Sequence, residues 1–166
     1  LDLGTGTGII AVSLLANLPN ARAVATDISA GALAMCARNA VANGVSARLT
    51  CVQSSWFESV EGRFDVIVSN PPYIPTEVIS GLSREVREFD PARALDGGAD
   101  GLDAYRALAD GAAAHLAEEG IVGLEIGHDQ RVPVSRIFEV AGFELSEFAQ
   151  DLGGNERALL FTRTGG

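Results

Sequence analysis

Apolar and polar residues along the chain form two kinds of segment, short apolar runs typical of strands and segments with the apolar spacing of helices. The two kinds alternate along the sequence. Short apolar runs of strand type are found at residues 1–3, 22–27, 47–52, 64–69, 120–126, 143–148 and 157–162. Segments with apolar side chains at helical spacing are found at residues 8–18, 29–43, 102–116 and 129–141. This alternation predicts an α/β fold of Rossmann-like type, with a mostly parallel seven-stranded sheet, helices on both faces, and ligands bound beyond the carboxyl ends of the strands.

Local signals set the limits of the predicted helices. Pro19-Asn20 ends the first helix, Ser29 is a good N-cap for the second, and Asn43-Gly44 closes it. Residues 70–101 lack a clear periodicity and are rich in Pro, Gly, Asp and Glu, which is typical of a functional or mobile connection. Because Leu1 already lies in an apolar segment, we expect the first strand to be truncated and an upstream part to be missing.

The length of 166 residues fits one domain, and we treat residues 1–166 as that domain. Twelve arginines, no lysine and 22 acidic residues give a net charge of −10, which disfavours a nucleic-acid partner. No apolar run approaches the ~20 residues of a membrane span, and no signal segment opens the chain. Cys36 and Cys51 are too few for a disulfide framework, so we expect both to be core thiols of a cytoplasmic protein. We also expect a monomer without a membrane partner.

A glycine-rich loop joins the first predicted strand to the first predicted helix. Gly4, Gly6 and Gly8 stand at every second position, where missing side chains let a ligand approach the backbone. The spacing is G-x-G-x-G rather than the G-x-G-x-x-G of dinucleotide-binding folds, which disfavours a nicotinamide cofactor. Asp27 ends the second strand 19 residues after Gly8, where a carboxylate can accept hydrogen bonds from both ribose hydroxyls of an adenosine. The alternative is a plain glycine turn with Asp27 as a surface residue.

The tetrapeptide Asn70-Pro71-Pro72-Tyr73 directly follows the predicted strand 64–69. Two prolines stiffen the backbone and supply no N–H, so the Pro71 carbonyl and the Asn70 side-chain oxygen form two acceptors beside the expected ligand crevice. Such a pair suits a substrate NH₂ group, whose lone pair can then be aimed at an electrophile, with Tyr73 as a flat wall. The alternative is a proline-rich turn that stops a strand.

With both motifs in place, the chain resembles class I S-adenosylmethionine-dependent methyltransferases. More narrowly, it resembles the family that methylates the glutamine amide of peptide chain release factors in translation termination. The resemblance covers nearly the whole chain. It is carried by LDLGTGTG (residues 1–8), WFESVEGRFDVIVSNPPYIP (56–75), EVREFDPARALDGGADGLDAYR (85–106), LEIGHDQ (124–130) and DLGGNERALL (151–160).

The resemblance implies the class I fold with an antiparallel last strand, S-adenosylmethionine as methyl donor, and a release factor as protein substrate. It implies that the donor is contacted by Asp2, Gly4, Thr5, Gly6, Thr7, Gly8, Asp27, Ile28, Ser55, Trp56 and Asn70. It also implies that the substrate amide is held by Asn70, Pro71, Pro72 and Tyr73, of which Asn70, Pro71 and Tyr73 serve catalysis.

The chain departs from the family pattern in two places. Ser55 stands before Trp56 where the family usually has Asp, and its hydroxyl can still hydrogen-bond an adenine amine. The family also has an N-terminal helical domain and a linker ahead of the catalytic domain, and we expect that part to lie upstream of these residues. Neither His115 nor His128 has ligand-type neighbours at metal spacing, and Asp90, Asp96, Asp100 and Asp103 do not match a calcium loop, so we expect no metal.

Two other functions are compatible with parts of this pattern. A methyltransferase acting on exocyclic amines of DNA or RNA bases accounts equally well for the tetrapeptide, although not for the acidic charge or the segment 85–95. A non-catalytic adenosine-binding module accounts for the glycine loop but gives no reason for Asn70-Pro71-Pro72-Tyr73.

Overall fold

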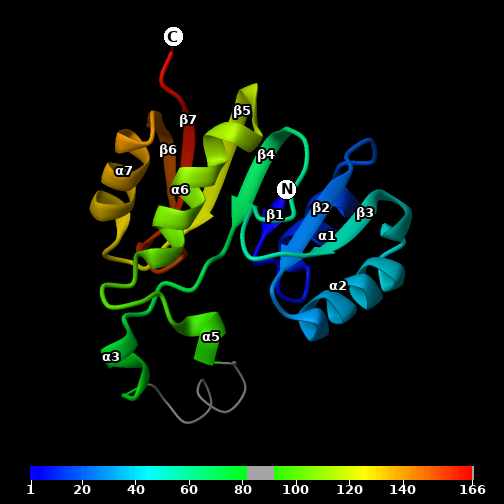
Figure 1. The fold of residues 1–166 in the computed structure, drawn as a ribbon, viewed down its shortest axis with the longest axis horizontal. Helices are drawn as coiled ribbons and strands as arrows, with labels where there is room; N and C mark the ends of the chain where they lie inside the picture. The colour runs from blue at the N-terminus through cyan, green and yellow to red at the C-terminus, as the bar shows by residue number, and fades with distance from the viewer. Residues whose placement is uncertain (82–91, 166) are drawn as a thin grey trace.

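The computed structural model describes residues 1–81 and 92–165, and within them one seven-stranded sheet forms the centre of the molecule (Figure 1). The strands are β1 (Asp2–Leu3), β2 (Ala23–Asp27), β3 (Leu49–Gln53), β4 (Phe64–Ser69), β5 (Leu116–Glu125), β6 (Phe143–Gln150) and β7 (Glu156–Arg163). Their order across the sheet is β3-β2-β1-β4-β5-β7-β6, and β7 is antiparallel to both of its neighbours. The predicted sheet, with its antiparallel last strand, is confirmed.

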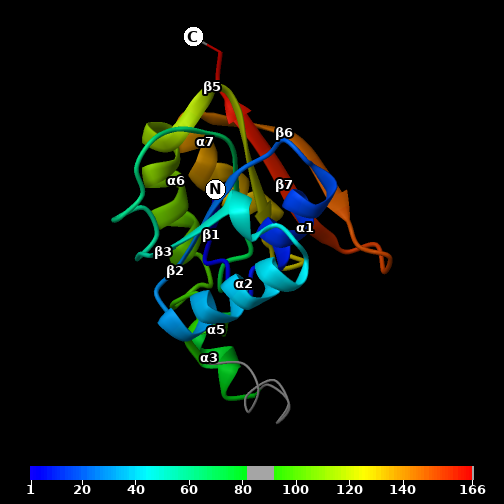
Figure 2. The same cartoon turned by 90° about the vertical axis from the view of Figure 1, so that its right-hand side faces the viewer.

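Helices cover both faces of this sheet. They are α1 (Ile9–Asn17), α2 (Ala30–Ala42), α3 (Thr76–Ile79), α5 (Ala92–Leu95), α6 (Asp103–His115) and α7 (Arg131–Val140), with a 3₁₀ turn η1 (Ser46–Arg48). Figure 2 shows α6 and α7 on one face and α1 and α2 on the other. No helix in the described ranges 1–81 and 92–165 is long and apolar enough to cross a membrane.

The main core lies between the sheet and helices α6 and α7. Phe138 of α7 stacks on Phe161 with 4.5 Å between ring centroids and meets Phe143 edge-on at 5.6 Å. All three rings are at most 1% exposed, and burial of each contributes roughly 1.5–3 kcal/mol to folding.

Both cysteines are free thiols, as expected. Cys36 is fully buried, and this burial raises the pKa of its thiol to about 12. Its Sγ lies 3.8 Å from Sγ of Cys51, which is half-buried.

Most element limits lie within two residues of the sequence prediction, and the start of β5 differs more. Strand β5 begins at Leu116 rather than at residue 120: Leu116 is buried and pairs with Phe64, and a register shift leaves the exposed Glu118 and Glu119 between it and the predicted apolar run. Strand β3 begins two residues late because residues 46–48 form η1. Within the long connection 70–101, α3 and α5 are single turns at the carboxyl edge of the parallel strands (Figure 1). Residues 82–91, which include Asp90 and the start of the family-like segment 85–106, lie outside the described residues.

The strand register determines where a ligand can bind. Leu3 of β1 pairs with Thr26 of β2 on one side and with Ser69 of β4 on the other. The chain runs outward from β1 through β2 to β3, whereas β4 lies on the other side of β1, so the strand order reverses between β1 and β4. Such a switch point opens a crevice at the carboxyl ends of the strands. The loops that follow Leu3, Thr26 and Ser69 therefore leave the sheet side by side.

Candidate active site

A cavity of about 500 Å³ lies at this switch point. Nine of the residues expected at the site line it, namely Gly4, Gly6, Thr7, Asp27, Ile28, Ser55, Trp56, Asn70 and Pro72. The structure therefore brings together segments that follow four different strands, β1, β2, β3 and β4. Six further lining residues were not expected: Ser29, Gly31, Ala32, Met35, Ser54 and Ala94.

Asp2 and Thr5 lie behind the glycine loop and do not line this cavity. Asp2 is 2% exposed, and its Oδ2 accepts hydrogen bonds from the Thr5 hydroxyl at 2.6 Å and from the backbone N–H of Ala11 at 3.1 Å. Burial raises the pKa of the Asp2 carboxyl, and these two hydrogen bonds act against that rise. The Asp2 carboxylate thus connects the glycine loop, through Thr5, to the start of α1, through Ala11.

Asp27 holds the loop from the other side. Its Oδ2 accepts from the Gly6 N–H at 2.9 Å, and its Oδ1 accepts from the Ser29 N–H at 2.8 Å. Each carboxylate oxygen has further acceptor capacity beyond these single bonds. Asp27 therefore fixes the glycine loop and the start of α2 and can also accept hydrogen bonds from a ligand in the cavity.

Gly8 faces away from the cavity and packs against α2. It has φ +84°, and a Cβ at this position would lie 2.5 Å from Cys36 Sγ and 3.2 Å from the Cys36 Cα. The Cα cannot turn away as a side chain would. We expect Gly8→Ala to lower the free energy of unfolding by about 2–5 kcal/mol, from left-handed strain plus overpacking.

Gly6→Ala is the matched control, measured beside Gly8→Ala by urea denaturation. Gly6 also has a positive φ, +56°, but nothing lies within 4 Å of its Cβ position. We expect Gly6→Ala to lower the free energy of unfolding by only about 1–2 kcal/mol, because the left-handed backbone conformation is its only source of strain. Equal losses in the two variants would contradict the argument from packing.

Trp56 closes the cavity from the loop after β3. Its φ is +47°, the only positive value among the described non-glycine residues. Ser54, which is 5% exposed, stabilises this turn: its hydroxyl donates to the Trp56 carbonyl at 2.9 Å and accepts from the Ser59 N–H at 3.0 Å. A Cβ on Gly4 would lie 3.8 Å from the Trp56 ring, so the ring lies over the start of the glycine loop. Ser55 lines the cavity beside it.

The tetrapeptide after β4 combines buried and open groups. Pro71 is buried and Tyr73 packs against the main core, whereas Asn70 is exposed. Burial and, secondly, the charge of Glu125 raise the pKa of Tyr73, so its hydroxyl stays protonated at neutral pH. In the described part of the chain, no group hydrogen-bonds the Asn70 side chain or the Pro71 carbonyl. Asn70 lines the cavity, so its side-chain oxygen is available to a ligand, whereas Pro71 and Tyr73 do not line the cavity.

Helical spacing could have predicted some of the lining residues that the sequence analysis did not identify. Ile28, Ala32 and Met35 follow one another at intervals of four and three residues, which places them on one side of the start of α2. Ile28 is 52% exposed and Met35 is 40% exposed, both high values for apolar side chains. No sequence signal marked Ala94, because its place depends on how the long connection returns to the site.

The histidines and the acidic loop have internal partners. His115 ends α6 and stacks on Phe57 at 5.0 Å, and His128 lies in the loop after β5. Arg106 binds Asp100 at 2.6 Å and Asp103 at 2.8 Å. Across residues 1–81 and 92–165, no three His, Cys, Asp or Glu side chains are grouped so that they could hold a metal.

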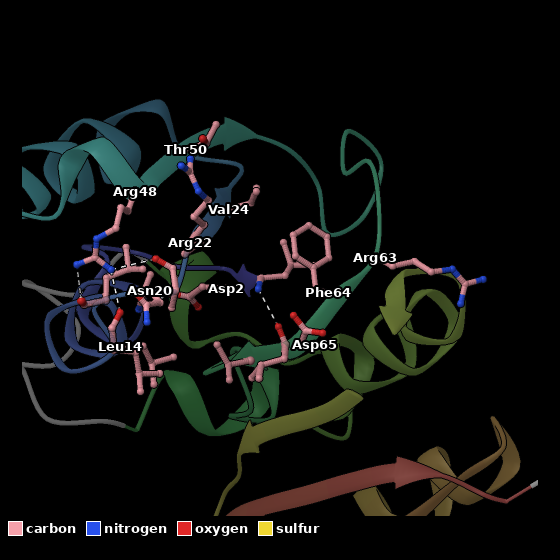
Figure 3. Close-up of a pocket in the computed structure, with 18 of the residues that line it drawn as sticks. Asp2, Leu14, Asn20, Arg22, Val24, Arg48, Thr50, Arg63, Phe64 and Asp65 are labelled. Atoms are coloured by element: carbon pink, nitrogen blue, oxygen red, sulfur yellow. Dashed lines mark hydrogen bonds between the residues drawn. The ribbon is translucent and has the colours of Figure 1, made fainter. Parts of the chain in front are cut away.

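A second cavity, of about 670 Å³, lies toward the amino ends of β1, β2 and β4 (Figure 3). Its most prominent polar group, Arg48, donates to the carbonyls of Leu15, Leu18 and Ala21 at 2.6–3.0 Å and so closes the end of α1. None of the three loops at the switch point contributes to its lining. We therefore place the chemistry in the smaller cavity.

Comparisons with known proteins agree with this geometry. The family described as "Methyltransferase small domain" matches residues 1–82. The crystal structure of a ribosomal protein L11 methylase from Lactobacillus delbrueckii subsp. bulgaricus superposes with a TM-score of 0.71 at 25% identity, covering 99% of this chain and 68% of that one. The fold and its switch-point cavity are those of a class I methyltransferase.

Sequence relatives narrow this class. The release factor glutamine methyltransferase of Agrobacterium fabrum is 52% identical over 98% of this chain, which covers 56% of the relative. The protein of the same name from Rhodospirillum rubrum is 48% identical over 98% of this chain, which covers 50% of that relative. The chain is thus similar over nearly its whole length to release factor glutamine methyltransferases, and it spans about half the length of these curated relatives.

Proposed function

We propose that residues 1–166 act as a methyltransferase catalytic domain that transfers a methyl group from S-adenosylmethionine to a glutamine amide nitrogen. The substrate is the glutamine of the Gly-Gly-Gln loop of a peptide chain release factor. The observation that carries the proposal is the exposed Asn70 side chain, which has no internal hydrogen bond among the described residues and lines a cavity that suits an adenosine, with the Pro71 carbonyl next to it in the chain. Because release factors work on ribosomes, this activity belongs in the cytoplasm.

The lining residues fit the methyl donor. Asp27 has acceptor capacity for ribose hydroxyls, the exposed apolar side chains of Ile28 and Met35 suit a flat adenine ring, and Ser55 can accept from its amine. The volume of about 500 Å³ falls within the usual range for cofactor sites. When bound, S-adenosylmethionine supplies an electrophilic methyl group on a sulfonium.

The chain's own task is to activate a poor nucleophile. The lone pair of an amide nitrogen is delocalised into its carbonyl, as in a peptide bond. The Asn70 oxygen and the Pro71 carbonyl can accept both N–H bonds, which favours a pyramidal nitrogen and stabilises the positive charge that it gains. Tyr73, whose hydroxyl is protonated, packs against the main core directly after Pro72, and we expect its aromatic ring to favour this charge from there. A strong base is not needed before transfer.

The acidic charge supports a protein acceptor over a nucleic acid. The fold alone does not select the acceptor, because one fold serves many substrates. A net charge of −10 repels a phosphate backbone, and a duplex base must be flipped out at a cost of a few kcal/mol. A glutamine on a protein loop needs only a narrow entrance. The similarity of the chain to release factor glutamine methyltransferases points the same way.

A transfer assay tests the proposal directly. The chain is incubated with isotope-labelled S-adenosylmethionine and, separately, with a release factor, duplex DNA and RNA. We expect the label on the glutamine of the Gly-Gly-Gln loop, located by mass spectrometry, and none on DNA. A release factor with Gly-Gly-Glu in place of Gly-Gly-Gln is the control and should stay unlabelled.

Two outcomes would favour the alternatives. Labelled adenine or guanine beside an unmodified glutamine would identify a nucleic-acid amine methyltransferase. Donor binding without turnover on any acceptor would identify an adenosine-binding module.

A further inference from the structure

Gln130 is a buried polar side chain directly behind the tetrapeptide. It is 7% exposed and caps the start of α7, one turn after the end of β5. Its Nε2 donates to the Tyr73 carbonyl at 2.9 Å and to the Gly101 carbonyl at 3.2 Å, and its Oε1 accepts from the Gly127 N–H at 3.0 Å. This pattern fixes the amide orientation, because the flipped amide would turn its NH₂ toward an N–H and its oxygen toward two carbonyls.

The other neighbour of the amide completes the network. The hydroxyl of the fully buried Tyr105 donates to the Glu125 carbonyl at 2.9 Å and lies 3.4 Å from Gln130 Oε1. Gln130 thus joins the turn after β4, the loop before α6, the turn after β5 and α6 itself. These contacts link three stretches that are well separated in the sequence, around Tyr73, residues 101–105 and Gly127.

Close backbone packing makes this geometry possible. Gly101 has φ +76°, and a Cβ there would lie 2.5 Å from the Tyr73 oxygen and 2.9 Å from Gln130 Nε2. A side chain at position 101 would therefore push the Tyr73 carbonyl or the Gln130 amide out of place. The approach of the three groups depends on this glycine.

The chain beyond Tyr73 is held by a short ladder to the segment after α5. Ile74 donates its N–H to the Leu95 carbonyl at 3.0 Å and accepts from the Gly97 N–H at 2.9 Å. The Thr76 N–H donates to the Gly98 carbonyl at 2.9 Å. The hydrogen bond from Gln130 to the Tyr73 carbonyl attaches the start of this ladder to α7, which packs on the sheet.

We propose that Gln130 is a positioning residue for methyl transfer, which holds the Tyr73 main chain and thereby the acceptor side of the site at its working distance from the donor cavity. The proposal rests on the function proposed above. Gln130 does not line the donor cavity, so its effect should fall on turnover and leave donor affinity unchanged.

Gln130→Met tests this role, because Met has a similar volume and neither donates nor accepts strongly. We expect kcat for the release factor to fall about tenfold or more, while the Kd for S-adenosylmethionine stays within about twofold of the parent. Val134→Ala is the matched control, since Val134 is fully buried one turn further along α7 and its side chain has no polar atom that could bind the Tyr73 carbonyl. A kcat for Gln130→Met equal to that of Val134→Ala would overturn the proposal.

Gln130→Glu provides a second test if Gln130→Met does not fold. It keeps the shape and an acceptor for the Gly127 N–H but removes the two N–H donors in its ionised form. Amide hydrogen exchange supplies a readout independent of any acceptor. We expect faster exchange at Ile74 and Thr76 and unchanged exchange at Val68 in the centre of the sheet.

The outcomes separate this inference from the proposed function. If the parent chain transfers no methyl group to a release factor, the proposed function fails, and hydrogen exchange still decides whether Gln130 fixes the ladder. If the parent chain is active and the Gln130 variants match it in kcat and in exchange, the positioning role is wrong.

Discussion

Asn70→Ala is expected to lower kcat for methyl transfer to a release factor by about 100-fold or more. The loss follows because the Asn70 oxygen acts mainly as positive charge develops on the amide nitrogen, so it stabilises the transition state more than the bound substrate. The Kd for S-adenosylmethionine should rise much less, since Asn70 is one of many residues that line the donor cavity. Single-turnover kinetics and calorimetry measure the two quantities separately.

Asn70 is exposed and has no internal hydrogen bond among the described residues, so its removal should change stability by no more than about 0.5 kcal/mol. This makes loss of folding an easily excluded explanation. Ser55→Ala is a useful control, because Ser55 lines the same cavity on the donor side and should affect Kd more than kcat. A kcat for Asn70→Ala close to that of the parent would show that the acceptor pair does not activate the amide.

The sequence predicted the fold well because its strands are short, apolar and separated by helices with clear ends. Every predicted strand has its counterpart in the sheet, and the reversal of strand order beside β1 is typical of such α/β sheets. The prediction failed where local pattern is weak. No apolar run marked Leu116 as a strand residue, because the exposed Glu118 and Glu119 separate this fully buried leucine from the apolar residues 120–126.

The same distinction applies to the site. Asp27, Asn70 and the glycine loop follow strands directly, so their convergence could be predicted from the carboxyl edge of the sheet alone. Gln130 and Ser54 could not be found in this way. Each acts through hydrogen bonds to backbone groups of another segment or turn, and such partners depend on tertiary packing rather than on spacing. Asp2 was expected to contact the methyl donor, but it does not line the cavity. Its carboxylate instead accepts hydrogen bonds from Thr5 and Ala11 and so holds the glycine loop in place.

Asp27→Ala is expected to weaken binding of S-adenosylmethionine by roughly 1.5–3 kcal/mol, which corresponds to about a 10- to 150-fold rise in Kd. The variant loses a charged acceptor for the two ribose hydroxyls. It also loses the hydrogen bonds that Asp27 accepts from the Gly6 and Ser29 N–H groups, so the loop itself can shift. Calorimetry on the folded variant measures the total effect, and an unchanged Kd would refute the assignment.

A ligand comparison separates the two contributions of Asp27. An adenosyl ligand without ribose hydroxyls should bind the parent chain more weakly than the complete ligand, because the carboxylate loses its partners. If Asp27 binds those hydroxyls, Asp27→Ala should bind both ligands with similar affinity, since the interaction is already absent. If Asp27 acts only by holding Gly6 and Ser29, removal of the hydroxyls should cost the variant as much as it costs the parent. The coupling between the carboxylate and the hydroxyls is therefore the quantity that decides whether Asp27 touches the donor or only shapes the loop around it.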